Sequence, residues 1–515
     1  MARVALIKLF TGLNLGVSQL SGQLQRAGHD TRIIYFKDFV VLPADQTDGY
    51  LVTDYALTNV AARGKEYVWN CYTPFSEREY GLLFEELERF PPDLIGLSLT
   101  SLTMQPAAEV TARLKRRFPG VPVIWGGAGP TIEPERALEH ADLVCKGEGE
   151  ELIVELADRL DAGADYSDLP DLWLKRAGAI IRNPNRPLPE LETIAIPDFE
   201  RARTIHINDD AVAHDVYPLV LGTQYPIMTQ RGCPFSCSFC IESVYQDMFG
   251  KKGSLRRRSV DVVIEELVRV KRTLGIRSVM FYDDVFTVNP RWLREFAPRY
   301  QREVGLPFWC YTYPTTTRAE DILLLKDAGL KSITMGIQSG SEEMLEHFHR
   351  PVAQQKAMEA ARTIVDCGVE CYFDLITKVH FEREEHLRRT FEFLVELPRE
   401  MRSVGFGAMV SFPEFGYTKR VAERGAALTV SDRDYMYYHK LYFLTRTPLP
   451  RPLVKAIGRS RLFRKFPRLL DALLPSQLPF HFLMDEDDAQ HTDVLNLPHA
   501  QAMLPGARVE QPTVQ

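Results

Sequence analysis

The sequence has little that would place the chain in a membrane or send it out of the cell. No stretch reaches the roughly 18 apolar residues that a membrane span needs. The opening MARVALIKLF has too short an apolar run, and no small-residue cleavage site, to be a secretory signal. We therefore expect a soluble, cytoplasmic protein without a transmembrane segment.

Basic charge and cysteine are also scarce. The formal net charge of the 515 residues is −7, whereas a nucleic-acid binder is normally basic or carries a long basic stripe. Eight cysteines in a chain of this length are too few for a secreted disulfide scaffold. Five of them are scattered and are expected to be small buried hydrophobic residues. These are Cys71, Cys145, Cys310, Cys367 and Cys371.

What the sequence does contain is a repeated alternation of apolar strands and amphipathic helices. The length alone favours two to four domains. Over residues 1–165 the alternation predicts βαβ units around a buried parallel sheet, that is, a doubly wound domain. The expected strands are 3–9, 30–36, 94–101, 121–127 and the start of 142–150.

The pattern changes at residue 166 and returns near residue 225. Residues 166–224 carry Pro170, Pro184, Pro187, Pro189 and Pro197 with short strand-like pieces between, which predicts a linker wrapped on the surface. Residues 225–416 contain six βα-type repeats. A complete barrel of eight repeats needs about 250 residues, so a partial (β/α)6 barrel fits better.

Residues 417–515 read as a helical region that ends in a poorly ordered polar tail. Within it, residues 450–474 form a basic amphipathic stretch. Its apolar side is expected to cap the barrel, and a helix lying on a membrane surface is the alternative.

The other three cysteines form a cluster in the segment TQRGCPFSCSFC, directly after the first barrel strand. Cys233, Cys237 and Cys240 have Cys-x3-Cys-x2-Cys spacing. A zinc site would want a fourth ligand, but no His or Cys follows within twenty residues, and the nearest upstream histidine is His214. Three thiolates suit a [4Fe-4S] cluster with one open iron. A zinc site and a chance or disulfide cluster remain as alternatives.

The segment RGCPFSCSFC resembles the signature of the radical S-adenosylmethionine (SAM) superfamily. The resemblance implies that the three cysteines hold the cluster and that its open iron binds the amino and carboxylate groups of SAM. It implies that one electron, from a reducing partner such as flavodoxin or ferredoxin, cleaves SAM to a 5'-deoxyadenosyl radical.

Further segments match this family and imply SAM contacts. Phe239 precedes the third cysteine, where an aromatic usually lies beside the adenine. Asp283 and Asp284 of FYDD end the second strand, near the expected position of the SAM amino group. They depart from the common Gly-Gly-Glu form and resemble the cobalamin-associated branch. Core packing for Phe239, and a helix cap or solvated loop for the aspartates, are the structural alternatives.

The segment GIQSGSEEML resembles the fourth-strand motif of the family. Gly336 would let backbone approach the ligand, and Gln338 and Ser339 would bind ribose or methionine groups. Gln338 replaces the more usual Glu. Arg350 lies where related enzymes use a cation for the SAM carboxylate, with a surface ion pair as its alternative.

The first domain resembles the cobalamin-binding domains fused to radical SAM cores, through SLTSLTMQPAAEV, VIWGGAGPTIEPERAL and DLVCKGEGEELI. Together the resemblance covers about residues 1–430 and implies a Rossmann-like cobalamin-binding domain. Strand ends and helix N-termini are where ligands enter such a sheet. The implied cobalamin contacts are Ser98, Thr100, Ser101, Gly126, Gly127, Gly147, Glu148 and Gly149.

Two features depart from that pattern. There is no Asp-x-His-x-x-Gly segment, and Gly129 stands where relatives often have His, so no lower cobalt ligand is offered. A degenerate domain that has lost the cofactor therefore remains an alternative. The segment FDLITKVHFEREE replaces the usual Gly-x-Pro-Gly-Glu turn, so no contact is carried over to Asp374 or His380.

The resemblance implies a cobalamin-dependent radical SAM enzyme acting on a small molecule in specialised metabolism. Its expected reaction is methyl transfer to an unactivated carbon through the 5'-deoxyadenosyl radical and methylcobalamin. The first alternative is a cyclase, ring-contracting or deoxygenating enzyme on the same scaffold. The second is a non-catalytic protein whose cysteines hold zinc. No motif indicates a nucleic-acid substrate.

Overall fold

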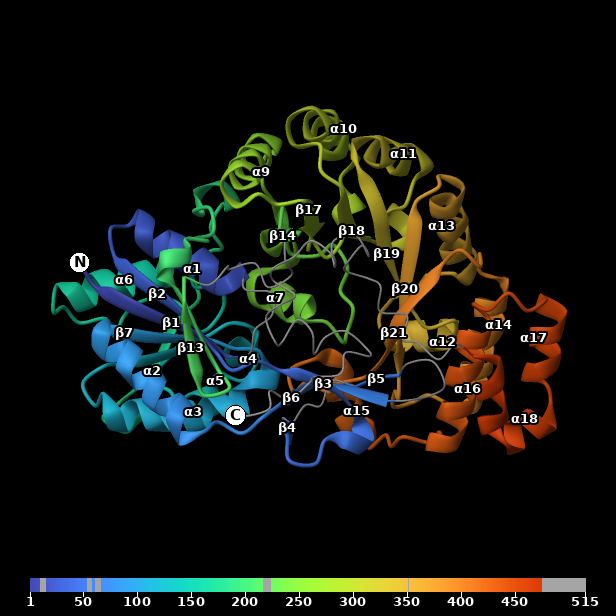
Figure 1. Cartoon of the computed structure of the whole chain (residues 1–515), viewed down its shortest axis with the longest axis horizontal. Helices are drawn as coiled ribbons and strands as arrows, with labels where there is room; N and C mark the ends of the chain where they lie inside the picture. The colour runs from blue at the N-terminus through green and yellow to red at the C-terminus, as the bar shows by residue number, and fades with distance from the viewer. Residues whose placement is uncertain (10–14, 53–57, 61–65, 216–223, 351, 475–515) are drawn as a thin grey trace, which may run out of the picture.

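Two βα units make up the molecule, and helices cover the outside of both (Figure 1). The structure is a computed structural model that describes residues 1–9, 15–52, 58–60, 66–215, 224–350 and 352–474. The expected disorder of the tail beyond residue 474 lies outside these residues. No helix in the described ranges is long and apolar enough to cross a membrane.

The first sheet has nine strands in the order β11-β10-β9-β8-β7-β1-β2-β12-β13. Its five predicted strands are parallel neighbours: β1 (Arg3–Leu9), β2 (Asp30–Phe36), β7 (Leu94–Ser98), β8 (Val123–Gly126) and β9 (Leu143–Cys145). Helices cover both faces: α1 (Leu15–Arg26) and α6 (Glu150–Asp161) on one, α2 (Glu77–Arg89) and α3 (Met104–Arg117) on the other.

The residues of β1 explain why both faces are covered. Val4 and Leu6 pack into the core under α1 and α6, whereas Ala5 and Ile7 pack into the core under α2 and α3. Successive side chains of a strand point to opposite faces. A strand that is apolar at every position therefore needs a layer of helices on each side.

The segment 166–224 differs from the surface linker that the prolines predict, because four of its pieces are strands of the first sheet. The hairpin of β10 (Leu172–Arg176) and β11 (Ala179–Arg182) pairs antiparallel with β9. At the other edge, β12 (Thr204–Asn208) pairs parallel with β2 and carries β13 (Ala211–His214). An open sheet edge has unpaired backbone groups, and these short strands satisfy them.

The second sheet begins with six parallel strands, as the six repeats predict. They are β14 (Gln224–Ile227), β17 (Ser278–Phe281), β18 (Phe308–Thr312), β19 (Leu330–Gln338), β20 (Glu370–Thr377) and β21 (Arg402–Ala408). The covering helices are α9 (Val260–Leu274), α10 (Pro290–Arg299), α11 (Ala319–Ala328), α13 (Gln354–Asp366) and α14 (Glu384–Glu396). Ser259 caps α9 through its side chain, which accepts from the Val262 backbone N–H.

Residues near the N-terminus extend this barrel, which the sequence did not predict. Strand β5 (Thr58–Val60) pairs antiparallel with β21, and β6 (Glu66–Tyr72) and β3 (Val40–Pro43) follow. A short strand β4 (Leu51–Val52) also pairs with β6. A segment from the first unit's part of the sequence therefore forms part of the barrel wall. Backbone hydrogen bonds between β5 and β21 attach this segment to the barrel.

The region after the barrel is helical, as expected. It contains α15 (Gly416–Arg424), α16 (Asp432–Leu444), α17 (Arg451–Gly458), α18 (Arg461–Lys465) and a 3-10 turn over Pro467–Leu473. Val454, Ile457 and Leu470 of the basic stretch are buried in the barrel core, so one side of this stretch does cap the barrel.

All eight cysteines are free thiols. The five scattered ones are buried, as predicted, with exposed fractions of at most 8%.

A buried carboxyl holds α16 against the loop between β20 and α14. The Tyr435 hydroxyl donates a hydrogen bond of 2.8 Å to Oε2 of Glu382, which is 4% exposed. Burial raises the pKa of Glu382 to about 7. The folded state therefore binds more protons than the unfolded state between the ordinary glutamate pKa and about 7, so ionisation of this carboxyl costs stability as the pH rises.

We expect Glu382→Gln to raise Tm relative to wild type at pH about 8 but not at pH about 5, because the amide cannot ionise. The difference corresponds to on the order of 1–3 kcal/mol. Glu385→Gln, at an exposed position on α14, is the matched control and should show no such pH dependence. Equal Tm values for wild type and Glu382→Gln at both pH values would contradict this account.

Candidate active site

The three clustered cysteines lie on the loop between β14 and α7 (Ile241–Phe249), at the carboxyl end of the first barrel strand. Cys237 is 7% exposed, and the other two are partly exposed. Burial, with a smaller effect from the Asp284 carboxylate, raises the pKa of Cys233 to about 12 and also raises that of Cys240. These thiols ionise only when a bound cation compensates, as iron does.

The backbone of this loop is fixed from two sides. The Gln246 amide on α7 donates to the carbonyl oxygens of Cys233 at 2.6 Å and Phe235 at 2.9 Å. Gly232 has φ +84°, and a Cβ there would lie 2.2 Å from the Ser254 carbonyl oxygen, so only glycine fits. Among the described residues, no three His, Cys, Asp or Glu side chains lie close enough together to hold a single metal ion.

The two neighbouring aspartates of FYDD have different surroundings. Asp283 is fully buried and accepts hydrogen bonds from the Thr229 and Gln230 backbone N–H groups at 2.6 and 3.0 Å. The Thr229 hydroxyl and the Arg257 guanidinium, at 3.3 Å, also donate to it. Asp283 therefore anchors the strand end from which the cysteine loop starts.

Asp284, by contrast, is exposed to solvent, and its carboxylate lies near enough to the Cys233 and Cys240 thiols to raise their pKa values. The surrounding protein still desolvates this carboxyl, and together with Asp283 it raises the pKa of Asp284 to about 6. Of the two aspartates, Asp284 is the one free to meet a ligand.

Arg350 lies at the cysteine loop and not on the surface. Its Nη1 donates to Sγ of Cys237 at 3.6 Å, and its Nη2 to the Gly336 carbonyl oxygen at 2.7 Å. The guanidinium stacks 4.1 Å from the ring centroid of Tyr313, whose ring stacks on Phe235 at 3.7 Å. The stack of Phe235, Tyr313 and Arg350 connects the cysteine loop to β19 and to the end of β18. Phe235 was missed by the sequence analysis, although it lies inside the cysteine motif.

The fourth-strand motif lies beside Arg350. A Cβ on Gly336 would lie 2.7 Å from Nε2 of Gln338 and 3.0 Å from Nη2 of Arg350, so a larger residue there would displace the ends of these two side chains. Gln338 has φ +66° and donates to the Asp374 carboxylate at 3.3 Å. Burial raises the pKa of Asp374. This places an amide and a carboxyl inside the barrel next to the loop.

Two other predicted SAM residues contact only protein here. Ser339 accepts from the Ser341 backbone N–H at 3.1 Å and therefore holds the turn after β19. Phe239 packs edge-on against Phe348 at 5.2 Å. Phe239 is partly buried, and its SAM contact stays a prediction.

The glycine-rich ends of the first sheet surround a slot of about 230 Å³ between the sheet and helices α1 and α6. Six of the eight predicted cobalamin residues line it: Ser98, Gly126, Gly127, Gly147, Glu148 and Gly149. Its deeper walls are apolar and include Leu6, Leu20 and Leu152. Thr100 and Ser101 do not line the slot; they form the turn that precedes α3.

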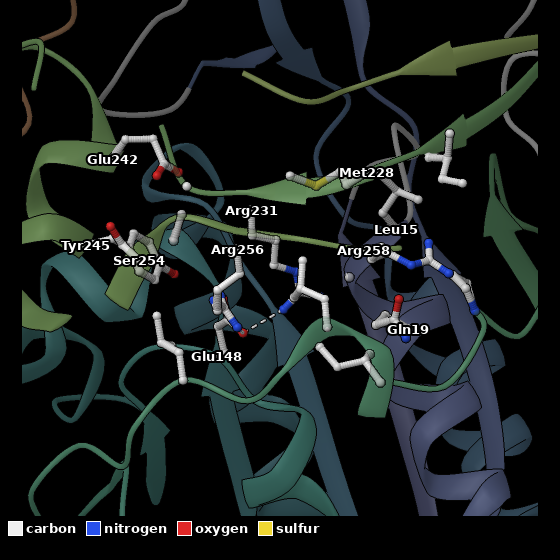
Figure 2. Close-up of a pocket in the computed structure, with 18 of the residues that line it drawn as sticks. Leu15, Gln19, Glu148, Met228, Arg231, Glu242, Tyr245, Ser254, Arg256 and Arg258 are labelled. Carbon is white, nitrogen blue, oxygen red and sulfur yellow. Dashed lines mark hydrogen bonds and ion pairs between the residues drawn. The ribbon is translucent and has the colours of Figure 1, made fainter. Parts of the chain in front are cut away.

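A second cavity, of about 340 Å³, lies between the two units and adjoins the slot. Figure 2 shows its lining: Leu15 and Gln19 come from the first unit, and Met228 and Glu242 from the strand and helix that flank the cysteine loop. Gly16, Glu148, Arg231 and Tyr245 line both cavities. The two cavities are therefore neighbours, separated at most by the side chains that they share.

Partly buried ion pairs join the units where the cavities meet (Figure 2). Arg231 donates to Glu148 at 2.8 Å and to Glu150 at 2.5 Å, and Arg256 also pairs with Glu148. Both arginines belong to the small sheet of β15 (Gln230–Arg231) and β16 (Arg256–Arg257), and both glutamates to the start of α6. The resemblance to cobalamin-binding domains implies that Glu148 contacts the ligand. In the structure the Glu148 carboxylate forms ion pairs with Arg231 and Arg256.

Glu242, two residues after the third cysteine, was also missed. It lines the cavity between the units, and its Oε2 is buried without a hydrogen-bond partner. Burial, with the Asp284 and Glu148 carboxylates, raises the pKa of Glu242 to about 8. A carboxyl directly after a cysteine motif has no sequence signal that separates it from an ordinary helix-start residue.

Family models match both units in the order that the resemblance predicts. The B12 binding domain model matches residues 9–157, and the radical SAM superfamily model matches residues 227–394. The chain belongs to the cobalamin-dependent radical SAM family.

Individual relatives agree. An uncharacterized methyltransferase of Pyrococcus horikoshii is 30% identical over 60% of this chain and 66% of its own length. The anaerobic magnesium-protoporphyrin IX monomethyl ester cyclase of Cereibacter sphaeroides is 24% identical over 74% and 59%. This chain thus spans somewhat less than two thirds of these curated relatives.

Among solved structures, the radical SAM methyltransferase TsrM from Kitasatospora setae, with cobalamin and a [4Fe-4S] cluster bound, has the same fold. Its TM-score is 0.62, its identity is 17%, and the match covers 82% of this chain and 78% of TsrM.

The position of Gly126 at the slot allows a test of where cobalamin binds. A Cβ on Gly126 would lie 3.5 Å from Cβ of Cys145, an ordinary contact, so a larger side chain can enter the slot without moving backbone. We expect Gly126→Leu to weaken cobalamin binding by at least about tenfold, because the leucine occupies space that the cofactor needs. The measurement is cobalt and corrin absorbance retained after desalting, with iron content recorded in parallel.

The control is Gly81→Leu on α2, where an added Cβ has nothing within 4 Å. It should leave cobalamin binding unchanged. Undiminished cobalamin uptake by Gly126→Leu would show that the cofactor does not use this slot.

Proposed function

We propose that this protein is a cobalamin-dependent radical SAM methyltransferase that methylates an unactivated carbon of a small molecule. The observation that carries the proposal is the contact between the two cavities. The slot at the ends of β7 and β8 adjoins a cavity that reaches the cysteine loop, and Arg231 lines both. Two cofactors held there would meet at one substrate position.

The residues at the cysteine loop fit the first cofactor. Cys233, Cys237 and Cys240 offer three sulfur donors, which would leave one iron of a [4Fe-4S] cluster open for SAM. Arg350 keeps a cation beside Cys237, suited to the SAM carboxylate, and Asp284 offers a carboxyl at the barrel mouth for the amino group. Gln338 and the Gly336 backbone lie close enough to serve the same ligand.

The slot fits the second cofactor. Its apolar walls and glycine-lined mouth suit a bulky ligand, and Gly126 and Gly127 let it approach the strand ends. No histidine is among the described residues that line either cavity. At Gly129 a Cβ would lie 2.6 Å from the Thr100 carbonyl carbon, so no histidine fits there. Cobalamin would therefore be held without a histidine on its lower face.

When bound, cluster and SAM supply a carbon radical strong enough to remove hydrogen from an unactivated C–H bond, and cobalamin supplies the methyl group. The barrel interior contributes exclusion of water. Val279, Phe281 and Cys310 belong to the core under the helices, so the alternating residues Tyr282, Trp309 and Tyr311 face inward. Trp309 contacts the tyrosine rings at 5.6 and 4.5 Å. A dry aromatic wall protects a radical from side reactions.

Two finer points complete the proposal. The electron would come from a reducing partner such as flavodoxin or ferredoxin. We also propose action in the cytoplasm, where thiols such as the eight here stay reduced.

Methyl transfer is tested with SAM labelled in its methyl group, in the reconstituted holoenzyme with candidate small molecules. We expect a product heavier by one labelled methyl, with S-adenosylhomocysteine and 5'-deoxyadenosine formed together. Formation of 5'-deoxyadenosine with an unlabelled product would overturn methyl transfer. It would favour a cyclase-type reaction, the activity named for the Cereibacter sphaeroides relative.

The cluster assignment is tested at Cys237, the most buried of the three cysteines. We expect Cys237→Ala to lose most iron and sulfide and to abolish SAM cleavage, because two thiolates cannot hold the cluster with an open iron. Cobalamin binding by the first unit should persist. Cys367→Ala, at a buried cysteine at the end of α13, is the control. Retained SAM cleavage in Cys237→Ala would refute the ligand set.

A further inference from the structure

A strongly basic surface element lies at the end of the molecule farthest from the first unit. Helices α17 and α18 form that edge (Figure 1). Residues 450–474 contain seven arginine and lysine residues against one aspartate, within a chain of net charge −7. Charge of one sign is therefore concentrated here against the balance of the whole protein, which barrel packing alone does not require.

Large apolar side chains are exposed in the same element. Of the ten large hydrophobic residues that the described surface exposes, four lie here: Leu453, Leu462, Phe466 and Leu469, each 46–57% exposed. They are distinct from Val454, Ile457 and Leu470, which face the barrel core. The element thus has one apolar side against the protein and a second apolar side in water.

Over α18 and the following turn, each exposed apolar residue is next to a basic residue in the sequence. Leu462, Phe466 and Leu469 each follow directly after a cation, Arg461, Lys465 and Arg468. Backbone hydrogen bonds from Phe466 N to Leu462 O and from Leu469 N to Phe466 O place them on successive turns. Residues three and four apart share one side of such turns.

These cations are available to a partner. Lys455 and Arg464 pair with Glu396, Glu384 and Asp434 of neighbouring helices. Among the described residues, however, the side chains of Arg459, Arg461, Lys465 and Arg468 form no ion pair. Nζ of Lys465 lies 5.5 Å from the centroid of the Phe466 ring, so an apolar ring and a cation are presented together.

We propose that α17, α18 and the turn to Leu473 form a docking element for the surface of an anionic phospholipid membrane. Exposed apolar side chains flanked by unpaired cations are what an interfacial element needs: the apolar groups enter the acyl boundary while the cations meet lipid phosphates. A nucleic acid would need the cations but not the leucines. The element is short, so the binding is peripheral and reversible. This proposal is independent of the methyl-transfer function.

The test is cosedimentation of the full-length protein with vesicles of phosphatidylcholine alone or of equal parts phosphatidylcholine and phosphatidylglycerol. We expect binding to the anionic vesicles only, weakening as salt is raised. Absence of binding to the anionic vesicles overturns the proposal.

Two triple variants separate the contributions. Arg461→Gln/Lys465→Gln/Arg468→Gln should lower the vesicle partition coefficient by about a hundredfold, since three surface cations are lost. Leu462→Ser/Phe466→Ser/Leu469→Ser should lower it by at least about tenfold through lost apolar burial. All six positions are exposed, so Tm and iron content should stay at wild-type values.

Matched controls lie on the exposed faces of the barrel. Arg272→Gln/Lys331→Gln/Arg362→Gln removes the same charge, and Leu323→Ser removes a comparably exposed leucine. Neither should change vesicle binding. Equal losses from the control and test triples would overturn the assignment of the surface. So would binding to a single-stranded DNA oligonucleotide without binding to vesicles, which would assign the element to nucleic acid.

Discussion

The partly buried ion pairs between Arg231, Arg256, Glu148 and Glu150 are the contact on which the arrangement of the site depends. Removal of one partner would leave a partly desolvated charge without compensation. Paired, the four side chains fix the start of α6 against the small sheet beside the cysteine loop. Arg231 is two residues before Cys233, so the position of the cysteine loop and that of the slot are set by the same side chain.

A second constraint comes from backbone pairing. Strands β5 and β6, from the N-terminal part of the chain, extend the barrel beyond β21. Strands β12 and β13, from the segment before the barrel, complete the first sheet. The barrel therefore contains strands that the sequence of the first unit separates from it, whereas β12 and β13 join the first sheet from the segment just before the barrel. The pairing of β5 with β21 and the arginine–glutamate ion pairs both connect the two units, which suits a site that must keep two bulky cofactors at a fixed separation.

Carboxyl groups around the cysteine loop have distinct tasks that follow from their surroundings. Asp283 accepts hydrogen bonds from the Thr229 and Gln230 backbone N–H groups and from Arg257. It therefore anchors the backbone that follows β14. Burial raises the pKa of Asp283 as well as those of Asp284, Asp374 and Glu242, so the shift does not separate the four carboxyls. The number of donors does: Asp283 has several, whereas Oε2 of Glu242 has none among the described residues. Carboxyls with few donors in a cleft are candidates for ligand contact.

The sequence by itself determined the two βα units, the six-stranded partial barrel and the position of the three cysteines. Strand and helix periodicity and close cysteine spacing are local properties of the chain. The glycines at the strand ends were also readable, because they mark close backbone approach. Only the tertiary structure decided which polar residues are bound by other protein groups and which are exposed near the cysteine loop. Asp283 and Asp284 are adjacent in sequence, yet Asp283 is buried on Thr229 and Asp284 is exposed. The pairing of Glu148 with Arg231, the stacking of Phe235, Tyr313 and Arg350, and the addition of β5 to β21 join segments far apart in sequence. Such contacts depend on how the elements pack, which no local pattern encodes.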